Sequence, residues 1–149
     1  MKIKWLRPGA GTILLLASLV LLCVGFGFYF ACFDALGYQQ DRFVIAFSII
    51  AMWIILALIV TDFIDAERPI YVTAVGLCYC FLVLFAFSRV LIPCLSPIGI
   101  LFTVNMGDKE AFALGVPRCF ASCGCYVVST LTFLLSYFFR GFQRKEANA

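Results

Sequence analysis

The stretch TILLLASLVLLCVGFGFYFACF, residues 12–33, contains no charged side chain. A helix needs about 20 consecutive apolar residues to cross roughly 30 Å of hydrocarbon, because a backbone in lipid must satisfy its own hydrogen bonds. Three further apolar runs of similar length occupy residues 43–61, 70–92 and 118–139. The sequence therefore predicts four transmembrane helices in a single membrane domain, residues 1–149.

The composition agrees with this class. The chain is 64% apolar and 13% charged, an excess that no aqueous core of a soluble domain explains. The basic residues before the first run are also typical of a signal peptide, but the run is longer than the apolar region of such peptides and no small-residue cleavage site follows it. We therefore expect an all-α integral membrane protein, folded as an up-down four-helix bundle.

The third connection, residues 93–117, is predicted to be the only long one. Pro93 and Pro97 are expected to end the third helix, and residues 98–104 are too short to span and too apolar for water. A short interfacial or re-entrant segment is therefore expected there, followed by a small helix that Gly115 and Pro117 end. The sequence thus predicts an outer lid over the bundle.

The distribution of Lys and Arg predicts the orientation. With both termini in the cytoplasm, seven basic residues lie inside and four outside, which satisfies the positive-inside rule. The basic tail, residues 140–149, then meets anionic headgroups, so the net charge of +3 requires no nucleic acid. We expect a multi-pass protein with both termini cytoplasmic and the lipid bilayer as its first partner.

Small residues recur at helical spacing in two of the predicted helices. We call these two rows the first-helix seam and the fourth-helix seam. Such seams allow the backbones of membrane helices to approach closely and to exchange weak hydrogen bonds. The first-helix seam comprises Gly11, Ser18, Gly25 and Cys32, and the fourth-helix seam comprises Ser122, Cys125, Ser129, Thr132 and Ser136.

The segment CFASCGC, residues 119–125, holds three of the eight cysteines in a chain without histidine. On one helix Cys119 and Cys123 share a face, but Cys125 points about 200° away from Cys123, so the three thiolates cannot converge on one metal ion. We expect no metal and no cofactor, and we interpret Cys125 mainly as a packing residue.

A disulfide is the alternative interpretation of the cysteines. Five of them map to the outer ends of the predicted helices, where an oxidising compartment favours bonds such as Cys94 to Cys119 or Cys94 to Cys32. A catalytic thiol pair is disfavoured, because the Cys-x-x-Cys spacing occurs nowhere in the chain. The candidate thiol cluster comprises Cys32, Cys94, Cys119, Cys123 and Cys125.

No ionisable residue lies deep in a predicted span, and no nucleophile has an evident base. Arg89 lies near the outer end of its helix, where it anchors at the headgroups and can pair with Asp34, Asp41 or Asp108. Arg89 and Arg118 are also the candidate contacts for an anion.

These observations favour a non-enzymatic accessory or scaffold protein that binds lipid, a membrane-protein partner or a second copy of itself. The alternatives are a small oligomeric transporter or channel component with an outer vestibule at Arg89 and Arg118, and a membrane thiol-disulfide protein. No motif of the chain identifies a family.

Overall fold

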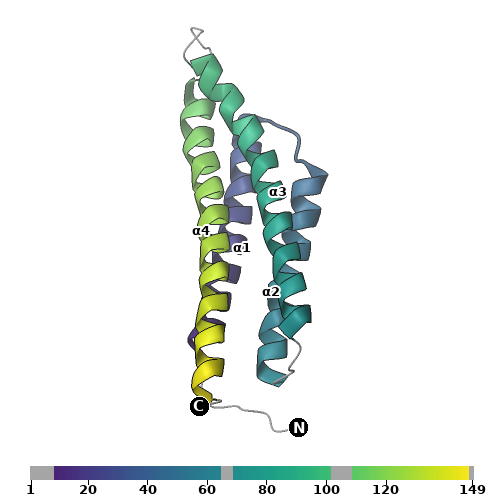
Figure 1. Cartoon of the computed structure of the whole chain (residues 1–149). Helices are drawn as coiled ribbons and strands as arrows, with labels where there is room; N and C mark the ends of the chain where they lie inside the picture. Colours follow the sequence, from purple (N-terminus) through teal and green to yellow (C-terminus); the bar gives the residue numbers. More distant parts are fainter. Residues whose placement is uncertain (1–8, 65–68, 102–108, 148–149) are drawn as a thin grey trace.

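The computed structural model describes residues 9–64, 69–101 and 109–147, with side chains for residues 9–61, 73–92, Leu95 and residues 114–139. It is all-helical, with α1 (Ala10–Leu36), α2 (Arg42–Ile64), α3 (Pro69–Leu101) and α4 (Lys109–Ala147) lying alongside one another (Figure 1). Each helix is long and apolar enough to span a membrane, so the predicted all-α class with four candidate spans is confirmed. These four spans suggest a multi-pass membrane protein.

The connection between α1 and α2 is fixed by hydrogen bonds at both ends. Gly37 has φ 66°, and its N–H donates to the Asp34 carbonyl at 3.2 Å, which ends α1 with a left-handed residue. At the start of α2, the Asp41 carboxylate accepts the N–H of Phe43 at 2.9 Å, and the hydroxyl of Tyr29 accepts the N–H of Asp41 at 2.7 Å. The loop is therefore held from α1 as well as from within.

The prediction of a long loop at residues 93–117 is wrong for most of its length. Pro93 and Pro97 lie within α3, which continues to Leu101, and α4 already begins at Lys109 and passes through Pro117. The prediction assumed that proline ends a helix, as it usually does in soluble proteins. In lipid the backbone groups next to a proline have no water to bond to, which favours helix on both sides of it. The small helix expected before Gly115 is instead the first part of α4. The predicted re-entrant segment, residues 98–104, is helical as far as Leu101, and its other residues lie outside the described part of the chain.

Gly115 also has a different role from the one predicted. A Cβ on this residue would lie 2.6 Å from Cγ of Leu36, so the absence of a side chain at Gly115 makes room for Leu36 of α1. Gly115 lies within α4 and does not end a helix. Helix α4 comprises 39 residues and is about 58 Å long at 1.5 Å per residue, which exceeds the thickness of the hydrocarbon core. The helix therefore extends well beyond its apolar window, Leu114–Phe139.

The helices pack in a ring in which α1 contacts α2 and α4, and α3 contacts α2 and α4. The contact between α1 and α4 is by far the most extensive. The centre is filled by fully buried side chains of all four helices, among them Tyr29, Tyr79 and Tyr126. Large apolar side chains cover the outside, where Trp53, Leu77 and Phe81 are each 69% exposed, as expected for a surface that faces lipid.

Two glycines allow side chains of α4 to approach closely. A Cβ on Gly25 of α1 would lie 2.9 Å from Cβ of Cys125 and 3.4 Å from the Ser122 carbonyl oxygen. A Cβ on Gly76 of α3 would overlap the ring of Tyr137, whose Cζ would lie 2.7 Å away. A larger residue at Gly25 would therefore press on atoms at or next to the α4 backbone, whereas one at Gly76 would have to displace the Tyr137 ring.

The Gly25 contact makes a test of the α1–α4 interface. Gly25→Ala is expected to lower the free energy of unfolding by about 1–3 kcal/mol relative to Gly27→Ala, since overpacking displaces neighbouring backbone. Gly27 is the matched control, because its added Cβ meets no atom within 4 Å and reports helix propensity alone. Unfolding in mixed detergent and dodecyl sulfate micelles measures both variants, and equal stability would contradict the close contact.

Candidate functional site

The most polar part of the interior is a cluster of three hydroxyl groups that joins α1, α3 and α4. Ser18 donates to the Ser129 carbonyl oxygen at 3.0 Å, and Ser129 donates to the Ser18 carbonyl oxygen at 2.8 Å. The Tyr79 hydroxyl lies 3.0 Å from Oγ of Ser129 and 3.2 Å from Oγ of Ser18. All three hydroxyl hydrogens thus have an acceptor: the two serines exchange bonds with each other's backbone, and Tyr79 donates to a serine oxygen.

Two further buried bonds join α4 to α1 and to α2. Ser122 donates to the Gly25 carbonyl oxygen at 2.8 Å, and the hydroxyls of Ser48 on α2 and Tyr126 on α4 lie 2.7 Å apart. Every buried side-chain nitrogen and oxygen among the described residues has a hydrogen-bond partner. These interior bonds therefore hold the helices together, and among the described residues no buried side-chain nitrogen or oxygen is left without a partner.

The two predicted seams lie mostly in this interior. Gly11, Ser18 and Gly25 of the first-helix seam are buried, and so is Cys32. In the fourth-helix seam Ser122, Ser129 and Ser136 are buried, whereas Cys125 and Thr132 are half-buried. Ser18 and Gly25 contact Ser129 and Ser122, so the two seams face each other within one chain.

The cysteines are divided between one disulfide and several free thiols. Cys119 is disulfide-bonded, while Cys32, Cys123 and Cys125 are free. Cys32 on α1 lies near enough to Cys123 and Arg118 on α4 to interact with them electrostatically. The candidate partner Cys94 lies outside the residues whose side chains are described, so its bond with Cys119 stays a prediction, and the alternative bond between Cys94 and Cys32 is wrong because Cys32 is free.

The chemistry open to these thiols is limited by burial. Cys32 is fully buried, and Cys119 and Cys123 are at most 6% exposed. Buried thiols of this kind are inert compared with exposed thiols in electropositive clefts. Among the described side chains, no three His, Cys, Asp or Glu residues come close enough to hold a metal ion.

The two candidate anion contacts are bound to different helices. Nε of Arg89 lies 3.8 Å from Oδ2 of Asp41, and its guanidinium lies over the rings of Phe43 and Phe85 at 5.6 and 5.8 Å. Nη1 of Arg118 instead donates to the carbonyl oxygen of Ala31 on α1 at 3.4 Å. Of the predicted carboxylates, Asp41 thus pairs with Arg89, and Asp108 lies outside the described residues. The pair is exposed enough to contribute little to stability.

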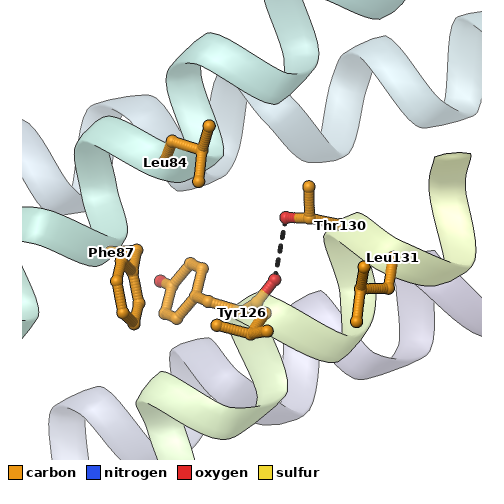
Figure 2. A pocket seen from close by; sticks show the side chains of 6 residues that line it. Leu84, Phe87, Tyr126, Thr130 and Leu131 are labelled. Atoms are coloured by element: carbon orange, nitrogen blue, oxygen red, sulfur yellow. Dashed lines mark hydrogen bonds between the residues drawn. The ribbon is translucent and has the colours of Figure 1, made fainter.

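A lateral groove lies between α3 and α4. Its volume is about 150 Å³, and it opens toward the outside of the ring of helices. Figure 2 shows Leu84 and Phe87 of α3 facing Tyr126 of α4, with Thr130 and Leu131 further along α4. Val127 completes the lining, which is almost entirely apolar.

Sequence reasoning missed both the groove and the buried tyrosines. Tyr79 and Tyr126 lie in the middle of apolar runs, which is an available signal, because a tyrosine at that depth needs a hydrogen-bond partner. The groove has no such signal. The groove depends on which side chains of α3 face α4. These helices are apolar all round, so no polar face in the sequence indicates how each helix is oriented.

The arrangement of the helices defines a class of protein: an all-helical chain with four candidate membrane spans and, among the described residues, a hydrogen-bonded interior. Compared with protein-family models, curated proteins and solved structures, the chain matches none of them.

The hydroxyl cluster predicts a non-additive mutant cycle. Ser18→Ala and Ser129→Ala are each expected to cost about 0.6–1.7 kcal/mol of unfolding free energy, the range found for hydrogen bonds between membrane helices. The double variant should cost more than the sum, because it leaves the buried Tyr79 hydroxyl without an acceptor.

Adding Tyr79→Phe to the double variant removes that unpaired group and should restore part of the loss. Unfolding in mixed micelles measures the cycle. Ser88→Ala is the control, since Ser88 is exposed and bonds only to its own helix at Phe85. Additive losses with no recovery in the triple variant would contradict the assignment of the cluster.

The cysteines predict a labelling pattern. In unfolded, unreduced protein a small maleimide should label the free cysteines Cys23, Cys32, Cys78, Cys80, Cys123 and Cys125 and leave Cys119 unlabelled until reduction. Peptide mass spectrometry reads each site and also tests the predicted bond with Cys94. Labelling of Cys119 without reduction would contradict the disulfide.

Proposed function

We propose that this chain is a non-enzymatic accessory or scaffold protein of a membrane, which binds lipid or a membrane-protein partner, including a second copy of itself, on its lipid-facing surface. The observation that carries the proposal is the closed interior: the described buried polar groups all bond to one another, and the groove between α3 and α4 opens sideways. Contact with other molecules is therefore available on the outside of the helix ring, where large apolar side chains are exposed.

In this proposal the two small-residue seams do not form the binding surface for a partner. Ser18 and Gly25 are occupied by Ser129 and Ser122 of the same chain, so these small residues serve internal packing. A partner then binds on the outer faces of the helices. The most exposed large side chains described there are Trp53 of α2, Leu77 and Phe81 of α3 and Phe138 of α4. Packing of apolar side chains, with no free polar group, is the interaction such a surface offers.

The proposed orientation places four antiparallel spans in an up-down bundle with both termini in the cytoplasm. The excess of Lys and Arg near the two ends of the chain and before α3 supports it. The disulfide at Cys119 also supports it, because Cys119 then lies at the end of α4 that faces an oxidising compartment.

The transport and thiol-exchange alternatives have less support. A transporter needs a polar site or an ionisable residue at the middle of the membrane. Arg89 instead lies near the end of the candidate span Thr73–Ile92 and Arg118 near the start of the span Leu114–Phe139, each with its own partner. A thiol-disulfide enzyme needs an exposed thiolate of low pKa next to a second cysteine, and the cysteines around Cys119 are buried.

Native mass spectrometry of the full chain, released from a mild detergent, tests the proposal. The expected result is a homo-oligomer, a co-purifying membrane protein or a monomer that retains phospholipid through detergent exchange. The same preparation in vesicles should show no uptake of small anions above that of protein-free vesicles, with Arg89→Gln/Arg118→Gln as the matched variant. A lipid-free monomer without partners would contradict the proposal, and so would uptake that this double variant abolishes.

A further inference from the structure

We infer that the groove between α3 and α4 binds one hydrocarbon chain of a membrane lipid, chosen by the shape of the chain and without regard to the headgroup. This inference rests on the proposed function and names the ligand class for one place on its surface. It combines three observations: the depth of the groove, the state of its two hydroxyl groups and its size.

The groove lies at the level of the lipid chains. Its α3 residues, Leu84 and Phe87, belong to the span Thr73–Ile92, and its α4 residues belong to the span Leu114–Phe139. Tyr126 and Leu131 lie close to the middle of that second span. At this depth the surroundings consist of hydrocarbon chains, whereas headgroups and water lie roughly 15 Å away on either side.

The polar atoms of the lining are already bonded. The Thr130 hydroxyl donates to the Tyr126 carbonyl oxygen at 2.9 Å, the bond drawn in Figure 2, and the Tyr126 hydroxyl bonds with Ser48 on α2 at 2.7 Å. A polar ligand would find no partner for its own groups and would lose its hydration on entry. The groove therefore selects against polar ligands and leaves an aliphatic chain as the fitting occupant.

The size of the groove also favours a chain over a helix. The groove offers about 150 Å³ of space with an almost wholly apolar lining, and it is open on the side where Leu84, Val127 and Leu131 are exposed. In soluble proteins an enclosed cavity of similar volume and lining binds small hydrocarbons. That volume holds a few methylene groups but not an entire helix of a partner protein. The gain on binding comes from van der Waals contact with Phe87 and Tyr126, because the lipid chain leaves one apolar environment for another.

Photocrosslinking of the full chain in phosphatidylcholine vesicles tests the inference. A small fraction of the phosphatidylcholine carries a diazirine in the middle of one acyl chain, and peptide mass spectrometry maps the adducts. Adducts are expected at Leu84 and Phe87 in excess over Trp53, which is 69% exposed on α2 but lies outside the groove. Unlabelled phosphatidylcholine and phosphatidylethanolamine with the same chains should compete equally.

Two double variants of α4 provide the comparison: one fills the groove, and the other makes the same kind of change outside it. Val127→Phe/Leu131→Phe fills it from residues that are 42% and 55% exposed, so the interior is not overpacked. Val128→Phe/Leu134→Phe makes the same change on α4 at 47% and 44% exposed residues outside the lining. Adducts at Leu84 and Phe87 should fall about threefold to tenfold in the first variant, the range that packing interactions in membranes support, and stay unchanged in the second.

Equal adduct yields in the filled variant and the wild type would overturn the inference, and so would competition that depends on the headgroup. A dimer that the filled variant dissociates, with unchanged lipid adducts, would assign the groove to a second copy of the chain and overturn it as well. In each case the proposed function is judged separately by lipid retention and oligomeric state in native mass spectrometry. The two proposals can therefore fail independently.

Discussion

The approach of α1 to α4 is the contact on which the rest of the structure depends. Gly25 leaves room for Cys125 at a distance that no larger residue permits, and this brings the backbones close enough for Ser122 to donate to the Gly25 carbonyl oxygen. Further along the same interface Ser18 and Ser129 bond to each other's carbonyl oxygens. In a membrane, where apolar burial gives no net attraction between helices, such close packing and hydrogen bonding are the available forces.

Tyrosine side chains extend this interface to the other two helices. Tyr79 of α3 joins the Ser18 and Ser129 pair, Tyr126 of α4 bonds with Ser48 of α2, and Tyr29 of α1 accepts the N–H of Asp41 at the start of α2. Each of these hydroxyls lies at the end of a large, rigid ring that also fills the centre of the bundle. The three tyrosine rings therefore fill the centre of the bundle. Their hydrogen bonds also fix how far each helix is shifted along its neighbour.

The sequence predicted the elements better than their contacts. Runs of apolar residues predict four spans because length and hydropathy alone determine them, and the spacing of small residues predicts a face for Ser18, Gly25, Ser122 and Ser129. It does not predict that these two faces meet, since that depends on tertiary packing. The third connection was mispredicted for a related reason: Gly115 and Pro117 are typical helix-ending residues in water, but here Gly115 makes room for Leu36 and Pro117 lies inside α4.

The groove follows from the same bonds that hold the bundle together. Helix α3 approaches α4 at Gly76, where the ring of Tyr137 occupies the space of a side chain, and through Tyr79, which bonds with Ser129. Nearer the middle of α4, Tyr126 is tied to Ser48 on α2, so its ring is not free to turn and fill the space beside Leu84 and Phe87. Tyr126 thus fills the interior on the side of α2 and leaves an open apolar groove on the side of α3. Among the described residues the buried polar side chains are all bonded, while the packing between α3 and α4 is incomplete. This is the space that we propose a lipid chain fills.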